Sequence, residues 1–209
     1  MRNEAIVKKL GLMHKEPIRI ASHKNHLCIY SGKKHCCSMW PAPNVAARYY
    51  HYNPVYKTSP MLSPDSLRAI FAPCRTIAVV GLSPKPHRDS YHVAQYLQQQ
   101  GYRIVPINPV AAQAGASILG QPCYASLSQA AQALAAQHIH IDMVNVFRNS
   151  ADVPPIAQEA IAIGAPCLWL QLGIRHDEAA AQARAAGLQV VQDRCTLVEH
   201  QRLHATGPF

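Results

Sequence analysis

The sequence lacks the marks of a membrane, secreted or disulfide-bonded protein. No apolar run reaches the roughly 18–20 residues that a membrane-spanning helix needs. The N-terminus lacks the basic, apolar and small-residue order of a secretory signal. The 7 cysteines are odd in number and scattered, and four lie singly in or beside apolar segments: Cys74, Cys123, Cys167 and Cys195. This usage is typical of reduced thiols, so we expect a cytoplasmic protein.

Charge is distributed unevenly along the chain, whose formal net charge is +9. Residues 1–60 hold 10 Lys and Arg against 2 acidic residues, a net charge of +8, whereas residues 61–209 hold 10 against 9, a net of +1. Residues 1–60 also show no sustained hydrophobic periodicity. We therefore expect residues 1–60 to be an irregular basic extension that is either disordered or not part of the native protein. If the extension is not native, Met61 is the true start of the protein.

The extension offers two candidate functions, neither with a specific pattern. Zinc ligands could come from Cys28, His35, Cys36, Cys37 and His51. Structural zinc sites take two closely spaced pairs of ligands, and these residues do not form two such pairs. We therefore expect no metal site. The mixture of cations and aromatic residues leaves open a redox-responsive nucleic-acid-binding regulator. The segment has no helix-turn-helix pattern, so nucleic acid is an unlikely partner.

From Ser63 onward, short apolar runs alternate with helical patterns. Strands are predicted in five apolar runs, at residues 76–81, 102–108, 141–147, 165–173 and 188–191. Helices are predicted at residues 63–71, 90–100, 126–137, 153–163, 176–187 and 196–203. Parallel strands need crossover helices, and this alternation supplies them. Residues 61–209 are therefore predicted to form an α/β domain, with a Rossmann-like, doubly wound, parallel five-stranded sheet.

Ligands of such sheets bind at the carboxyl ends of the strands, where the strand order reverses. The loop after the first predicted strand reads GLSPKPHRDSYHV. Gly81 permits a tight turn there, Ser83 and Ser90 offer hydroxyl groups, and Lys85 and Arg88 offer cations. A helix N-terminus follows this loop, and such termini attract anions. The loop is therefore predicted to bind phosphate.

The other predicted strands end in loops that also carry polar residues. Asn108-Pro109 follows the second strand, where a nucleotide would lie, and Phe147-Arg148 follows the third, where an aromatic face and a guanidinium could hold adenine and a phosphate. Gln171 and Gly173 follow the fourth strand and are expected to face the cleft. The first loop has a single glycine, and the second strand lacks a terminal acidic residue for a ribose. An NAD(P)-dependent oxidoreductase therefore remains only an alternative.

A family resemblance extends through all these loops in order. It is carried by IAVVGLSPKPHRDSYHVAQYL, YRIVPINP, DMVNVFR, LWLQLGI and VVQDRCTLVEH. Residues 63–204 closely resemble the stand-alone CoA-binding-domain family of small bacterial proteins, which is related to the CoA-binding half of the succinyl-CoA synthetase α subunit. The resemblance implies CoA or acyl-CoA lying across the strand ends. By that resemblance the binding residues are Gly81, Leu82, Ser83, Lys85, Arg88, Ser90, Asn108, Pro109, Val146, Phe147, Arg148, Gln171 and Gly173.

No set of catalytic residues is evident. The larger synthetases carry a phosphorylatable histidine in a further domain, for which we expect no room before Phe209. His176 lies at a predicted helix start and His200 in the closing helix, and Cys195 has no catalytic spacing to His200. Asp193 and Cys195 belong to the DRC stretch of the resemblance, which assigns them no defined role. We therefore expect a CoA-binding protein that is non-enzymatic by itself.

Overall fold

The computed structural model describes residues 18–23, 26–31, 34–35 and 63–205. The chain divides into two compact units, Met1–Tyr56 and Lys57–Phe209. In the first unit, β1 (Ile18–His23), β2 (His26–Ser31) and β3 (Lys34–His35) form an antiparallel sheet in the order β1-β2-β3. The sequence patterns do not predict these strands. The side chains of the candidate zinc set lie outside those that the structure describes.

The second unit contains the predicted parallel sheet. Its strands are β4 (Thr76–Val80), β5 (Arg103–Ile107), β8 (Met143–Val146), β9 (Cys167–Leu170) and β10 (Gln189–Val191). They pair in the order β10-β9-β8-β4-β5, and every pairing is parallel. This order is the flavodoxin-like version of the doubly wound sheet. The predicted fold class is therefore confirmed.

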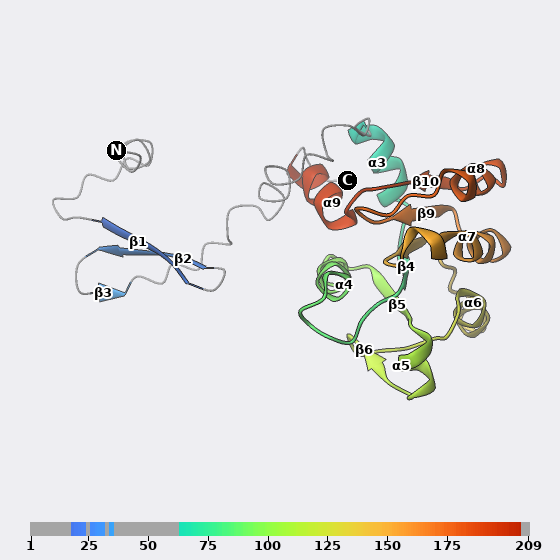
Figure 1. The fold of residues 1–209 in the computed structure, drawn as a ribbon, viewed down its shortest axis with the longest axis horizontal. Helices are drawn as coiled ribbons and strands as arrows, with labels where there is room; N and C mark the ends of the chain where they lie inside the picture. The colour runs from blue at the N-terminus through green and yellow to red at the C-terminus, as the bar shows by residue number, and fades with distance from the viewer. Residues whose placement is uncertain (1–17, 24–25, 32–33, 36–62, 206–209) are drawn as a thin grey trace. The chain divides into compact units, whose positions relative to one another are not determined.

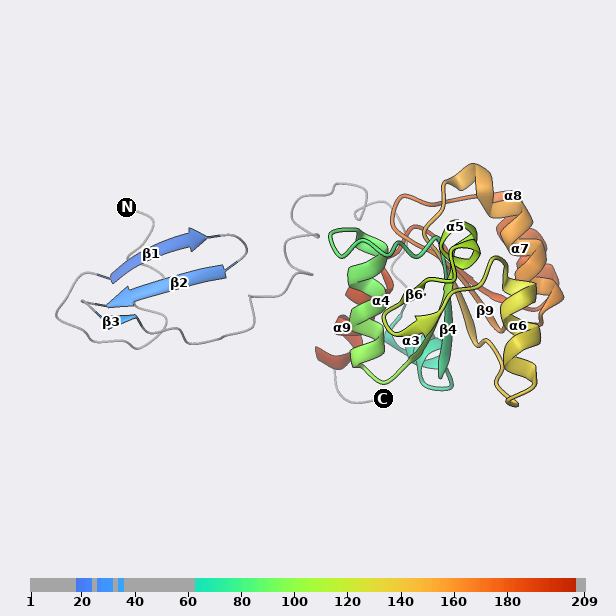
Figure 2. The same cartoon turned by 90° about the horizontal axis from the view of Figure 1, so that it is seen from below.

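Helices cover both faces of this sheet, as Figures 1 and 2 show. One face carries α3 (Pro64–Phe71), α4 (Asp89–Gln99) and α9 (Thr196–Ala205). The opposite face carries α6 (Leu127–Ala135), α7 (Val153–Ala162) and α8 (Asp177–Ala185). Among the described helices, none combines the length and the apolar character that crossing a bilayer would require.

Side-chain caps fix where several helices begin. The Ser63 hydroxyl accepts a hydrogen bond from the backbone N–H of Ser66 at 3.1 Å, and Ser126 caps α6 in the same way through Gln129. Four short elements were not predicted: α5 (Pro109–Gln113), β6 (Ser117–Ile118), β7 (Gln121–Pro122) and the 3₁₀ helix η2 (Ser150–Asp152). Elements of two to five residues are too short for hydrophobic periodicity to identify them.

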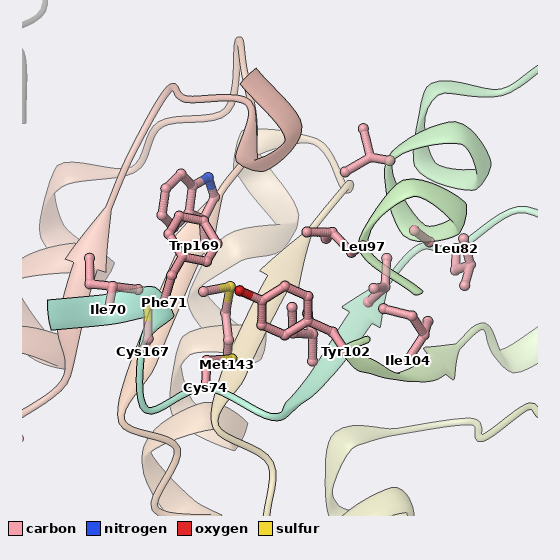
Figure 3. Packing of buried hydrophobic residues seen from close by; sticks show 14 of the residues in the cluster. Ile70, Phe71, Cys74, Leu82, Leu97, Tyr102, Ile104, Met143, Cys167 and Trp169 are labelled. Carbon is pink, nitrogen blue, oxygen red and sulfur yellow. The ribbon is translucent and has the colours of Figure 1, made fainter. Parts of the chain in front are cut away.

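Large aromatic and aliphatic side chains fill the space between the sheet and the α3, α4 and α9 helices. Trp169 of β9 lies fully buried against Phe71 of α3, with the ring centroids 5.4 Å apart. Figure 3 shows this pair together with Tyr102, Leu97 and Met143 in the same layer. Successive strand residues point to opposite faces, so each strand contributes to both cores.

Candidate functional site

The strand order reverses at β4, which lies between β5 and β8. The chain leaving β4 enters α4 on one face, whereas the chain leaving β8 enters α7 on the opposite face. The two loops, residues 81–88 and 147–152, therefore diverge from neighbouring strand ends. Such a divergence is where ligands of this fold class bind.

Gly81 is the first residue after β4 and has a φ of +85°, a region that favours glycine. A Cβ at this position would lie 2.9 Å from the carbonyl oxygen of Phe147 and 3.0 Å from Cδ of Arg148. The backbone N–H of Gly81 donates to the carbonyl of Ile107 at 2.9 Å. Glycine is therefore required because the protein's own loops approach each other closely.

The loop after Gly81 is held in shape by its own hydroxyl groups. The buried Ser90 hydroxyl accepts from the backbone N–H of Ser83 at 3.1 Å, and the Ser83 hydroxyl accepts from the N–H of Lys85 at 3.2 Å. Lys85 and Arg88 are exposed, and Arg88 is the N-cap residue of α4. The loop thus presents two cations beside a helix N-terminus.

Asn108 ties the loop after β5 to the loop after β4. Its side-chain oxygen accepts from the backbone N–H groups of Val110 and Ala111, at 3.1 and 3.2 Å. Its amide nitrogen donates to the carbonyl of Leu82 at 2.9 Å. The Leu82 side chain is fully buried, and Pro109 is exposed beside the tie. Asn108 therefore fixes the relative position of two predicted binding loops.

Gln171 lies in a buried polar network beneath the ends of β8 and β9. Its amide nitrogen donates to Oδ1 of Asn145 at 2.8 Å and to the hydroxyl of Thr196 at 2.6 Å. The residue is only 3% exposed, and Val146 is fully buried. Gly173 is exposed, and its N–H donates to Asp193 at 2.7 Å. Sequence reasoning expected Gln171 at the cleft but not its partners.

The loops after β8 and β9 bring further cations to the same end of the sheet. Phe147 is half-buried, and the exposed Arg148 pairs through Nε with Asp152 at 3.3 Å. Arg175, which sequence reasoning missed, is exposed and pairs with Asp177 at 3.0 Å. The sequence signal that could have identified Arg175 is a cationic residue a few positions after a buried strand.

The DRC stretch supports the loops and the core. Asp193, at a φ of +56°, accepts from the Gly173 N–H, and Arg194 is buried in an ion pair with Glu199 at 3.1 Å. Cys195 is partly buried, and burial raises the pKa of its thiol. A raised pKa keeps the sulfur protonated at neutral pH, which makes it a poor nucleophile.

The two histidine candidates have structural partners. Nδ1 of His176 accepts from the N–H of Ala179 at 3.2 Å and so caps α8. His200 is buried, with its ring nitrogens 2.9 and 3.1 Å from the hydroxyls of Tyr96 and Tyr102. Burial lowers the pKa of His200 to about 4, so the ring is neutral at pH 7. Both nitrogens are engaged inside the core.

The residues at the switch point fit a phosphate-bearing ligand. Four exposed cations follow β4, β8 and β9, namely Lys85, Arg88, Arg148 and Arg175. α4 begins at the same end, and helix N-termini favour anions by about 0.3–1 kcal/mol at exposed positions. β5 is followed by Asn108, not by an acidic residue that would repel a phosphate.

Comparison with known proteins gives the family. Residues 75–201 match the CoA binding domain family. The uncharacterized protein YneT of Bacillus subtilis (strain 168) is 36% identical over 138 residues, covering 66% of this chain and 94% of YneT. The solved structure of cell-free ID.343 from Thermus thermophilus is 36% identical, with a TM-score of 0.60 over 68% of this chain and 99% of that one. A hypothetical protein from Pyrococcus horikoshii OT3 is 34% identical, with a TM-score of 0.61 over 70% and 97%. The chain therefore belongs to the CoA-binding domain family.

Proposed function

We propose that residues 63–205 bind CoA or acyl-CoA and deliver or sense it in the bacterial cytoplasm, with no chemistry of their own. The observation that carries the proposal is the pair of exposed cations at the switch point, in a chain of the CoA-binding domain family. The hydroxyls of Ser83 and Ser90 hold the backbone of the loop that carries Lys85, and Arg88 is the N-cap residue of α4. This cradle suits a pyrophosphate.

In this proposal the rest of the ligand extends along the strand ends. The nucleotide lies near Asn108 and Pro109, and the pantetheine arm runs toward the loops after β8 and β9. The tie between Asn108 and the carbonyl of Leu82 keeps the two nucleotide-binding loops at a fixed separation. Preorganised loops lose little conformational entropy on binding, which favours affinity.

A thermal-shift titration of the full chain with CoA, acetyl-CoA, NAD and NADP tests the ligand class. We expect the melting temperature to rise with the CoA species alone. A ligand at 100 times its Kd stabilises the folded state by about 2.7 kcal/mol. A rise with NAD or NADP in place of CoA would refute the proposal in favour of the oxidoreductase alternative.

Arg88→Ala tests the phosphate cradle. We expect CoA binding to weaken by about ten- to a hundredfold in calorimetry, since a hydrogen bond to a charged group contributes about 1.5–3 kcal/mol. Arg103→Ala is the control, because Arg103 is an exposed cation at the amino end of β5, whereas the candidate site lies at the carboxyl ends of the strands. Unchanged affinity of Arg88→Ala would remove this residue from the site.

The nucleic-acid alternative depends on residues 1–60, of which the structure describes only three strands. A gel shift with duplex DNA at two salt concentrations tests it separately. Phosphate contacts make such binding strongly salt-dependent. We expect no shift.

A further inference from the structure

Arg148 lies across the point where the two central loops diverge. A Cβ placed on Gly81 would lie 3.0 Å from Cδ of Arg148, so the aliphatic stem of this arginine passes directly over the Gly81 backbone. Gly81 follows β4 and Arg148 follows β8, the two strands at the reversal of order. The guanidinium is thereby carried to the mouth of the crevice in which the ligand of this fold class binds.

Asp152 holds this guanidinium from one side. Oδ2 of Asp152 lies 3.3 Å from Nε of Arg148, and the two side chains are 40% and 54% exposed. An ion pair through Nε leaves the two terminal nitrogens of the guanidinium for another partner. Two parallel N–H groups at the end of an arginine match the oxygens of a phosphate.

The sequence around Asp152 explains why its carboxylate is available. Asp152 is the N-cap residue of α7, where an aspartate ordinarily accepts from the N–H groups two and three positions into the helix. Those positions are Pro154 and Pro155, which have no N–H to donate. Asp152 accordingly makes no side-chain cap hydrogen bond, and its carboxylate turns to Arg148.

We infer that Asp152 is a positioning residue, which holds Arg148 over Gly81 as a phosphate-binding group in addition to Lys85 and Arg88. The inference rests on the proposed function and adds a residue that the resemblance did not assign. An unanchored arginine loses rotamer entropy when it is fixed on a ligand, and the ion pair with Asp152 restricts the side chain before binding. Asp152 therefore increases affinity although its own charge repels phosphate.

Two opposing effects of Asp152 can be separated by a matched variant. Glu178 lies exposed in the first turn of α8, which follows β9, and it is in none of the ion pairs that the structure gives for the described residues. Asp152→Ala and Glu178→Ala make the same change in net charge. Only Asp152→Ala releases the arginine that crosses Gly81. A purely electrostatic effect on CoA affinity would therefore appear in both variants with the same sign, whereas a positioning effect would appear in Asp152→Ala alone.

The test is a double-mutant cycle on CoA affinity, measured by calorimetry on the full chain. We expect Arg148→Met to weaken CoA binding about ten- to a hundredfold. Asp152→Ala should weaken it about three- to tenfold in the wild type and less than twofold in Arg148→Met. Glu178→Ala should leave it unchanged or tighten it. Thermal melting of the ligand-free variants controls for a structural role, since positioning leaves the melting temperature nearly unchanged.

Each contrary result has a distinct meaning. If Asp152→Ala bound CoA as tightly as the wild type or more tightly, the positioning role would be overturned. It would also be overturned if Asp152→Ala weakened binding by the same factor in the wild type and in Arg148→Met. In both cases CoA binding by the wild type would leave the proposed function standing. Absence of CoA binding by the wild type itself would overturn the proposed function and this inference together.

Discussion

The two faces of the parallel sheet are packed by different physical means. The face under α6, α7 and α8 is apolar and rich in small residues, with buried alanines on all three helices. The face under α3, α4 and α9 holds the aromatic core and a group of buried polar side chains on and around α9. That group consists of Asn145, Gln171, Arg194, Thr196, Glu199 and His200.

The difference predicts how each face responds to substitution. Apolar packing is non-directional, so a core of that kind tolerates changes that conserve volume. A buried polar group depends on particular partners, and losing one partner leaves the other unpaired at a high cost. The polar face also supports the candidate site, since Gln171 and Ser90 belong to it and lie below the binding loops. Substitutions on the α9 side should therefore affect both stability and ligand binding.

The largest effect is expected from Glu199→Gln. Glu199 is fully buried and accepts from Arg194 at 3.1 Å and from Arg202 at 2.9 Å. Removing its charge takes an anionic partner from the buried Arg194, and breaking a buried ion pair in this way costs about 3–5 kcal/mol. Urea denaturation at pH 7 measures the loss of unfolding free energy.

An exposed ion pair supplies the control for Glu199→Gln. Asp65 pairs with Arg68 on α3 at 3.2 Å, and its side chain is 93% exposed. Water screens such a pair, so Asp65→Asn should leave the unfolding free energy almost unchanged. If Glu199→Gln behaved like Asp65→Asn, the polar face would not depend on its ion pair, and the contrast between the faces would fail.

His200 should make the polar face sensitive to acid. Burial, with a smaller contribution from His204, lowers its pKa to about 4, against about 6.5 for an unfolded histidine. Between these values the unfolded chain binds the proton more readily than the folded protein, so stability rises with pH across that window. At about 1.36 kcal/mol for each pH unit, acidification from pH 6.5 to 4 should cost about 3 kcal/mol through this group.

The measurement is the pH dependence of the unfolding free energy in wild type and His200→Gln. The variant loses the hydrogen bonds to Tyr96 and Tyr102 and should be less stable at pH 7, but its stability should fall less between pH 6.5 and 4. His140→Gln, at an exposed position, should keep the wild-type profile. Identical slopes in wild type and His200→Gln would assign the acid sensitivity to other groups.

The sequence predicts much of this architecture because local signals and the global fold agree. Ser63-Pro64-Asp65 marks the start of α3, and the five apolar runs become the five parallel strands. Gly81 was recognisable because a lone glycine at a strand end implies an unusual φ. The close approach that Gly81 permits was not recognisable, since it involves Phe147, which lies 66 residues further along the chain.

Side-chain partners across the fold were the part that sequence reasoning could not predict. Gln171 follows a strand and so reads as a cleft residue, yet its partner Thr196 is supplied by α9, whose packing is a tertiary property. His176 reads as a candidate catalytic residue until its cap to Ala179 is seen. Asp152 was overlooked because its effect depends on Arg148 and on the missing N–H groups of two prolines.

Thr196→Val should give the smallest effect of the three, because it removes hydrogen bonds without changing charge or volume. The Thr196 hydroxyl accepts from the amides of Gln171 at 2.6 Å and Asn145 at 3.3 Å. Valine keeps the shape but leaves these buried donors with fewer acceptors, at a cost of about 1–3 kcal/mol in unfolding free energy. The matched control is Thr76→Val, also buried, since there the backbone N–H makes the hydrogen bond to Asp142. If urea denaturation gave equal losses for both variants, the network under the site would be no more specific than ordinary packing, and the distinction between the two faces would rest on the ion pair alone.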